Sequence, residues 1–285
     1  MGGSEAPLVT GTSRRDAAVP RGATSIRAAL VAEWIKLSTI PHALVYGTAA
    51  VVLGAGWAGA GTYLSRTEFL AAIAERDDAI ALSSMMWLGV TRFTIVVAMV
   101  LGATLLTSER ETGTAVMTRI VLPHPAAVYG AKVAWAGAIG LVVGVIAGLA
   151  VPLAVRMMLG PAATGFTVLP SLWLGYGVRV AIVTGLCATA GVALGALTRS
   201  LLLTAAIAFV WVMFENTVAS MTGDFANLYV LTPWRNLTYF IDGSGFDLPY
   251  LWDAIWGFAP LAALTVILVL AGALRHCRDT HTIKE

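Results

Sequence analysis

The sequence predicts an all-α membrane protein with six transmembrane helices, and three observations support this fold class. Of the 285 residues, 58% are hydrophobic and only 12% are charged. Soluble domains carry about 25% charged residues, so this chain lacks the polar surface to cover itself in water. Six apolar runs each have the roughly 20 residues that a helix needs to cross a bilayer core of about 30 Å. Lys and Arg are concentrated on one side of these runs, mainly in the two terminal segments and the connection after the second run, as expected for a multi-pass protein.

Short segments containing proline or charge separate the six runs. Pro41 precedes the first run, Pro123 and Pro125 precede the third, and residues 198–200 join the fourth to the fifth. A link this short makes the fourth and fifth helices antiparallel neighbours. The runs cover residues 43–64, 85–107, 131–155, 171–197, 201–219 and 254–274.

Glycines recur every four residues in the third run and again in the fourth. Small residues at this spacing allow two membrane helices to approach closely. Packing within the chain is the interpretation we favour, and a seam between two copies is the alternative. The glycines are Gly140, Gly144 and Gly148 in the third run and Gly191 and Gly195 in the fourth.

The positive charges predict a cell-membrane protein with both termini in the cytoplasm. Of the 18 Lys and Arg residues, 12 fall on the side of the termini and four on the opposite side. This asymmetry is the usual signal of orientation. We expect a disordered cytoplasmic tail (1–25), a transmembrane domain (26–274) and a cytoplasmic C-terminal tail (275–285). The 12 are Arg14, Arg15, Arg21, Arg27, Lys36, Arg110, Arg119, Lys132, Arg199, Arg275, Arg278 and Lys284.

Residues 26–37 predict a short amphipathic helix on the membrane surface. Ile26, Leu30 and Trp34 belong to the apolar half of the helix, while Glu33 and Lys36 belong to the polar half. An apolar face that carries Trp, with cations nearby, is typical of helices at the headgroup boundary. The alternative is a simple N-terminal extension of the first transmembrane helix.

The connection between the second and third runs predicts another short helix, over 115–122, on the cytoplasmic side. Gly113 allows the sharp turn into it, and Thr112 or Thr114 is expected to cap it. Prolines end it before the third run begins. This helix presents a small apolar docking surface, although an ordinary structured loop is the alternative. The exposed residues would be Val116, Met117, Arg119 and Ile120.

These elements, in this order, resemble the permease subunit of ABC-2-type exporters over about residues 28–274. The motifs are Glu33-Trp-Ile-Lys-Leu37 on the surface helix, Ser108-Glu-x-x-x-Gly-Thr114 after the second run, and Ala131-Lys132 opening the third. The resemblance implies six transmembrane helices and a coupling helix that docks into a cleft of a separate ATPase subunit. It implies that the surface helix flanks this contact. The coupling role falls on Glu109, Gly113 and Thr114, with Glu111 as the alternative acidic position, and the flanking role on Glu33 and Lys36.

The motifs that the sequence lacks limit its chemistry. No G-x-x-x-x-G-K-[ST] loop occurs, so ATP and Mg would be bound by a partner ATPase. Neither a zinc-protease motif nor a serine-hydrolase motif occurs, so we expect no enzymatic activity in this chain. Cys187 and Cys277 lie far apart and form no metal or disulfide pattern. The net charge of +2 gives no indication of a nucleic-acid partner.

The expected function is export of an amphipathic molecule, such as a drug, a peptide antibiotic or a lipid-like compound. Two permease chains, as a homodimer or a heterodimer, would combine with ATPase subunits in the lipid bilayer. A membrane scaffold or sensor that transports nothing is the alternative.

Three charged residues fall inside predicted spans. Arg92, Arg179 and Glu215 all lie in the outer half of the bilayer by helix rise. Charges at such depth usually pair or face water. We expect Glu215 to pair with one arginine and the other to line a cavity for cargo, with purely structural pairing as the alternative. The aromatic connection 220–253 is expected to dip into the outer interface, and the resemblance implies short re-entrant helices there.

Overall fold

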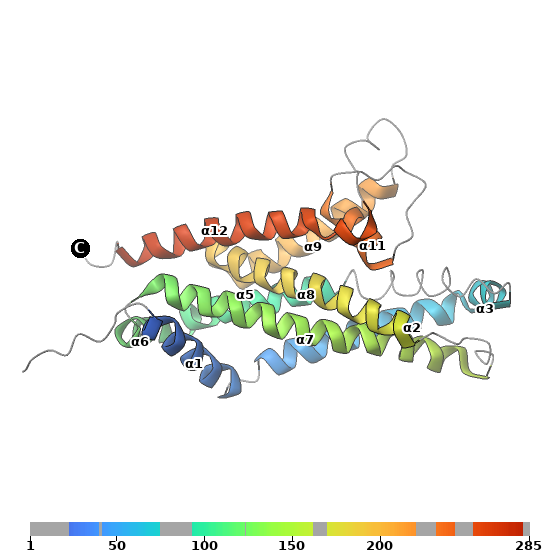
Figure 1. The fold of residues 1–285 in the computed structure, drawn as a ribbon, viewed down its shortest axis with the longest axis horizontal. Coiled ribbons are helices and arrows are strands. Elements are labelled where there is room, and N and C mark those ends of the chain that lie inside the picture. Colours follow the sequence, from blue (N-terminus) through green and yellow to red (C-terminus); the bar gives the residue numbers. More distant parts are fainter. Residues whose placement is uncertain are drawn as a thin grey trace, which may run out of the picture.

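The computed structural model describes residues 23–39, 42–74, 93–122, 124–161, 170–220, 232–242 and 253–281. All regular secondary structure in these ranges is helical (Figure 1). The helices are α1 (Ala23–Thr39), α2 (His42–Leu64), α3 (Arg66–Ala74), α5 (Ile95–Glu111), α6 (Thr114–Val121), α7 (Pro125–Leu159), α8 (Pro170–Thr198), α9 (Leu201–Ser220), α11 (Pro233–Asp242), the 3-10 turn η3 (Ala254–Trp256) and α12 (Ala259–His281).

Four helical segments in the described ranges are long and apolar enough to cross a membrane, which indicates a multi-pass membrane protein. They match the first, third, fourth and sixth predicted runs. The fifth run forms α9, whose apolar part is the shorter segment Leu201–Phe214. The second run is described only from residue 93 onward, so residues 85–92 of that prediction lie outside the described residues. The four spans are Leu44–Leu64, Pro125–Leu159, Leu174–Thr198 and Ala254–Arg278.

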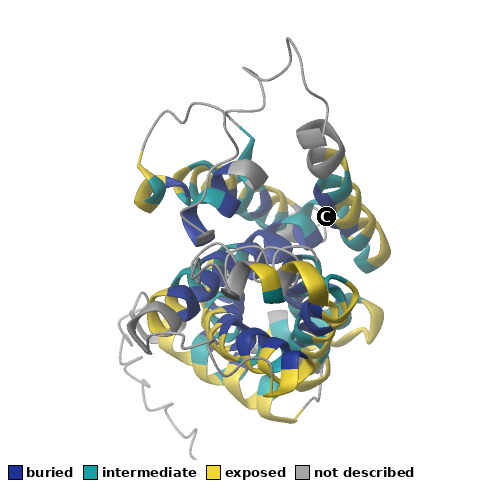
Figure 2. Cartoon of the chain, turned by 90° about the vertical axis from the view of Figure 1, so that its right-hand side faces the viewer, coloured by how far each residue is buried: buried dark blue, intermediate teal, exposed yellow. Residues whose placement is uncertain are grey.

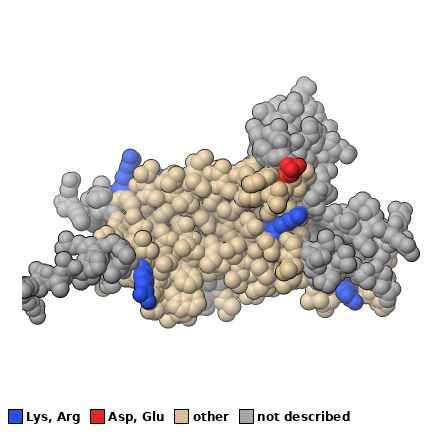
Figure 3. Space-filling model, in the orientation of Figure 1, with Lys and Arg blue, Asp and Glu red and all other residues tan. Residues whose placement is uncertain are grey.

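The helices form an elongated bundle with an apolar outer surface. Seen along the long axis, exposed residues face outward and buried residues face the interior (Figure 2). On the face drawn in Figure 3, charged side chains lie toward the two ends, with a wide uncharged band between them. α6 and the C-terminal end of α12 lie at one end, whereas α3 and α11 lie toward the other (Figure 1). The uncharged band is the part of the surface suited to lipid tails.

Helix α8 occupies the centre of the bundle and contacts α5, α7, α9, α11 and α12. The glycine row of α7 faces it. A Cβ on Gly140 would lie 2.8 Å from Ala188 Cβ, and a Cβ on Gly144 would lie 2.5 Å from Ala181 Cα. Such separations leave no room for a side chain. The packing interpretation is therefore confirmed for these two glycines, and the row serves contacts inside the chain rather than a seam between copies.

The glycines of α8 itself face α5. A Cβ on Gly191 would overlap the carbonyl oxygen of Met99, and a Cβ on Gly195 would lie 3.2 Å from Ala103 Cα. On α5, Gly102 meets the backbone of Ala188 in the same way. Three helices, α7, α8 and α5, are thus held at backbone contact through small residues.

The turn between α8 and α9 contains the one non-glycine residue of the described ranges with a positive φ. Arg199 has φ +60°, in the left-handed region. Residues with a side chain pay roughly 1–2 kcal/mol for this conformation because Cβ approaches the following carbonyl. The turn is as short as predicted, and α8 and α9 are neighbours.

Replacing Arg199 by Gly should therefore raise the free energy of unfolding by about 1 kcal/mol, because glycine adopts positive φ freely. Thermal unfolding in detergent, followed by tryptophan fluorescence, would measure the change. Arg199→Ala is the control, because it removes the guanidinium and keeps the strain. Equal effects of the two substitutions would show that the backbone conformation is not the cause.

Part of the aromatic connection 220–253 forms the helix α11. Leu237, Phe240 and Ile241 are buried, and α11 contacts α8, α9 and α12. Pro233 is the first residue of the helix. This position suits proline, whose missing N–H would have no partner in the first turn.

Candidate functional site

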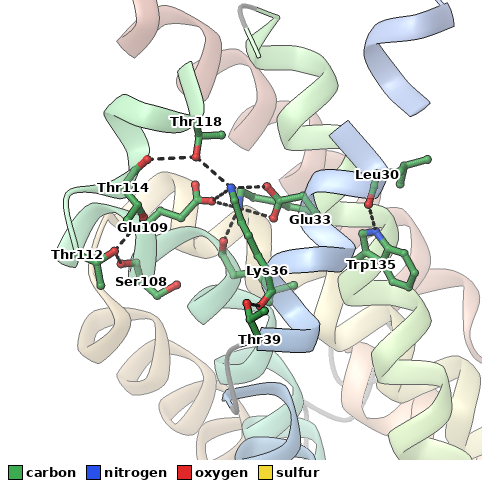
Figure 4. Close-up of polar contacts among 12 residues, drawn as sticks. Leu30, Glu33, Lys36, Thr39, Ser108, Glu109, Thr112, Thr114, Thr118 and Trp135 are labelled. Carbon is green, nitrogen blue, oxygen red and sulfur yellow. Dashed lines mark hydrogen bonds and ion pairs between the residues drawn. The ribbon is translucent and has the colours of Figure 1, made fainter. Parts of the chain in front are cut away.

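The residues that the resemblance links to coupling gather at the end of the bundle that carries α6. Glu33 and Lys36 lie on α1, Glu109 lies in the last turn of α5, and Gly113 and Thr114 form the entry to α6. Figure 4 shows side chains from α1, α5, α6 and α7 converging at this point. Residues up to 99 positions apart in the sequence thereby become direct neighbours.

Four charged side chains form a continuous cluster here (Figure 4). Lys132 Nζ lies 2.8 Å from Glu33 Oε2 and 2.9 Å from Glu109 Oε1. It also donates a hydrogen bond of 2.8 Å to the carbonyl oxygen of Leu105. Lys36 Nζ lies 2.6 Å from Glu109 Oε1 and 3.1 Å from Glu33 Oε1. We call Glu33, Lys36, Glu109 and Lys132 the four-charge cluster.

The four-charge cluster is electrically balanced, and its members Lys132 and Glu33 are buried whereas Lys36 and Glu109 are partly exposed. Lys132 is only 1% exposed and Glu33 only 4%. Two carboxylates offset two ammonium groups, so the cluster carries no net charge. An unpaired ion at such a position costs several kcal/mol, whereas a paired and hydrogen-bonded one is tolerated. The burial of Lys132 therefore depends on α1 and α5 both being docked against α7.

Opposing effects set the pKa of Glu109, which lies beyond the predicted membrane span. Burial by itself would raise this pKa, but Lys132 and Lys36 lower it, and the net pKa is below the ordinary value of 4.5. For Lys36, burial would lower the pKa, but the hydrogen bond to Glu109 and the nearby carboxylates raise it above 10.5. Both shifts favour the charged forms, so Glu109 and Lys36 stay ionised over the physiological pH range.

Acid should weaken the fold through Glu109. Because its pKa is lower in the folded state, its stabilisation is complete above the unfolded value of 4.5 and is lost as the pH falls through the folded pKa. The raised pKa of Lys36 acts at the other limit: its stabilisation is complete below 10.5 and is lost as the pH rises through the folded pKa. The unfolding temperature should be flat between these limits and drop on the acid side. Glu109→Gln should give a lower plateau with a shallower acid-side drop, and an unchanged drop would contradict this prediction.

Lys36 also connects the cluster to α6. Its Nζ donates a hydrogen bond of 3.0 Å to Thr118 Oγ1, and Thr118 donates in turn to the carbonyl oxygen of Thr114 at 3.2 Å. The chain enters α6 at Gly113, whose φ of +72° confirms the predicted sharp turn. The prediction that Thr112 or Thr114 caps α6 is wrong. Gly113 occupies the cap position without a side chain, and Thr112 donates back to the carbonyl oxygen of Ser108 at 2.8 Å.

Helix α6 exposes an apolar face. Val116, Met117 and Ile120 are 61%, 68% and 72% exposed. They form the surface predicted from the sequence. Glu111, the alternative acidic position, is exposed at the end of α5, so Glu109 is the carboxylate that joins the cluster. The side chain of Arg119 lies outside the described residues, and its role stays a prediction.

Helix α1 is separate from α2 and packs on α7. Trp34 stacks on Trp135 with ring centroids 4.8 Å apart, and Trp135 Nε1 donates to the carbonyl oxygen of Leu30 at 3.0 Å. The polar half of α1 points inward through Glu33, whereas Ile26, Val31, Trp34 and Ile35 are each more than half exposed. The apolar side of α1 thus faces outward and its polar side faces the protein, which is the opposite of a helix on a water-soluble protein and is typical of a helix in contact with lipid.

The charges predicted within the spans are described only in part. Arg179 donates to the carbonyl oxygens of Phe240 and Ile241 at 3.1 and 3.5 Å, and its guanidinium lies 5.9 Å from the ring centroid of Phe240. A cation at the C-terminal end of a helix, here α11, is favourable. Arg92 and the side chain of Glu215 lie outside the described residues, so their pairing and the cargo cavity stay predictions.

The sequence indicated most of the cluster but missed the roles of Lys132 and Thr118. The sequence identifies Lys132 as a cytoplasmic positive charge that opens the third run, without a partner. The signal that identifies its role is a lysine with Ala131 and Val133 beside it inside an apolar run, since such a charge needs a partner. Thr118 gives no such signal, because its contact with Lys36 depends on how α1 and α6 meet.

Comparison with known proteins gives no family for this chain. No family model matches the sequence, and neither the curated proteins nor the solved structures contain a significant match. Within the described ranges, no three His, Cys, Asp or Glu side chains are placed to hold a metal ion.

Proposed function

We propose that this chain is the membrane-spanning permease subunit of an ATP-driven exporter of the ABC-2 type. In this proposal it crosses the cell membrane six times, with α9 and the segment around α5 completing the spans and both termini in the cytoplasm. Two permease chains and two ATPase subunits form the transporter. The ATPase subunits bind ATP and Mg, and the cargo is amphipathic.

The observation that carries this proposal is the apolar face of α6. Val116, Met117 and Ile120 are exposed on α6, at the end of the bundle where α12 also ends (Figure 1). This end is rich in positive charge, including Arg275 and Arg278 on α12, as expected for the cytoplasmic side. An exposed apolar helix face beyond the membrane band is suited to insertion into a groove of a partner protein.

A second supporting observation is the connection from α6 into the membrane. α6 is joined to the membrane-spanning helix α7 through Thr118, Lys36 and the other members of the four-charge cluster. A partner that binds and moves α6 would therefore act on a transmembrane helix. This is the arrangement that a transporter powered by a separate ATPase requires, because a displacement outside the membrane must change the structure inside it.

Co-purification with a matched pair of variants tests the proposal. The full chain, isolated from its native membrane in mild detergent, should retain an ATPase that contains a P-loop and should stimulate its turnover in lipid. Met117→Glu should weaken that association by at least about 2 kcal/mol, roughly 30-fold, because it places a charge in an apolar contact. Met117→Leu keeps an apolar side chain of similar volume and should bind normally. Absence of an ATPase from the purified material would favour a scaffold or sensor instead.

A further inference from the structure

The four-charge cluster joins α1, α5 and α7 at one end of the bundle. α6 follows α5 in the chain and packs against it, whereas α1 packs against α7. Lys36 joins α1 to Glu109 on α5, Glu33 joins α1 to Lys132 on α7, and Lys132 joins α7 to Glu109. The oxygen Oε1 of Glu109 accepts from both lysines, at 2.6 and 2.9 Å. A single carboxylate oxygen in the last turn of α5 therefore binds lysines from both α1 and α7.

Burial makes these contacts difficult to open one at a time. Lys132 is almost completely inaccessible to water, so separating it from Glu33 or Glu109 leaves an ammonium group without full compensation. A movement of α1, α5 and α7 together keeps every ion pair intact and avoids the free-energy cost of an uncompensated ammonium group. The link to α6 is of a different kind, since the hydrogen bond from Lys36 to Thr118 is 3.0 Å long and involves a neutral hydroxyl.

We propose that the four-charge cluster is a clamp that makes α1 and α7 follow α6, with Lys132 and Thr118 as its positioning residues. Thr118 couples α6 to α1, and Lys132 couples α1 and α5 to α7. The inference deepens the proposed function, because it names the route by which a partner bound to α6 would act on a membrane-spanning helix. Without the clamp, a displacement of α6 would pass to α5 through the turn at Gly113 and would reach α7 only through the packing of α5 on α7 and α8.

Distance measurements between spin labels test the clamp without any partner. The full chain in lipid nanodiscs would carry labels at Met117 on α6 and Val31 on α1, or at Met117 and Val142 on α7. All three positions are exposed. Cys277→Ser removes the more accessible native thiol, since Cys187 is buried. Each pair should give a single narrow distance distribution in the otherwise unchanged protein.

Two substitutions should each release one part of the clamp. Thr118→Val replaces the hydroxyl that accepts from Lys36 by a methyl group, so it should abolish the narrow distribution of distances between α6 and α1. Because all four charges stay paired, the unfolding temperature should stay near its original value. Thr118→Ser retains a hydroxyl and should preserve the narrow distribution. Lys132→Met combined with Glu33→Gln leaves the balanced pair Lys36–Glu109, and should abolish the narrow α6–α7 distribution.

The outcomes separate a clamp from a purely structural cluster. If both Thr118→Val and the Lys132→Met/Glu33→Gln variant keep narrow distributions, the cluster only stabilises the fold and the inference is overturned. The proposed function is judged independently by capture of an ATPase. If the variants broaden the distance distributions but the purified chain carries no ATPase, the transporter proposal is rejected and the clamp stands. If an ATPase is bound but the variants leave both distance distributions narrow, the clamp is rejected and the transporter proposal stands.

Discussion

Lys132→Met should lower the free energy of unfolding by about 3–5 kcal/mol, the usual cost of removing one partner from a buried ion pair. The substitution fits the same space but leaves Glu33 and Glu109 facing a single lysine. Chemical unfolding in mixed micelles, followed by tryptophan fluorescence, would measure the loss. It is one of the two largest effects that we expect from a single substitution in this chain.

Charge balance provides the control for this prediction. Lys132→Met together with Glu33→Gln leaves one lysine and one carboxylate, so the double variant should recover a large part of the lost stability. Losses that simply add would show that the two residues do not interact, against the 2.8 Å contact between Lys132 Nζ and Glu33 Oε2.

Gly191→Ala should have a comparable effect by a different cause. The added methyl group would overlap the carbonyl oxygen of Met99 and lie 2.8 Å from its Cα, so α5 and α8 would have to separate. Overpacking of this kind typically costs 1–3 kcal/mol, and contact with backbone rather than a flexible side chain places the expected cost at about 3 kcal/mol. Unfolding in mixed micelles again gives the measurement.

Gly175→Ala is the matched control on the same helix. A Cβ at Gly175 would meet nothing within 4 Å. The same substitution there should be neutral or stabilising by up to about 1 kcal/mol, because alanine favours a helix over glycine. If Gly175→Ala and Gly191→Ala changed stability equally, close approach of α5 and α8 would not explain the loss.

Much of the helix order could be predicted from the sequence, because the lengths of apolar runs and their punctuation are local properties. The runs that became α2, α7, α8 and α12 are long enough to identify without tertiary information. The turn at Gly113 and the tight link at Arg199 were also evident, since they depend on a few adjacent residues. The glycine rows predicted close packing but not which helix lies opposite.

The arrangement of the site depended on contacts between distant segments. Glu33 and Lys132 are 99 residues apart, and no local pattern pairs them. The helical wheel of α1 separated polar from apolar residues correctly, but only the docked structure shows the polar half turned toward α7. Arg179 is a similar case, because its carbonyl partners belong to α11, a helix that composition alone did not delimit.

The order of the cluster along the chain has a consequence for biogenesis. Glu33 and Lys36 leave the ribosome well before Glu109 and Lys132, so α1 has no complete docking site until the start of α7 is synthesised. Until then its charged side must remain hydrated at the bilayer surface. Attachment of α1 must therefore wait for α7, and a chain shortened at its N-terminus by this one helix would insert its later segments but leave Lys132 with Glu109 as its one carboxylate partner in the cluster.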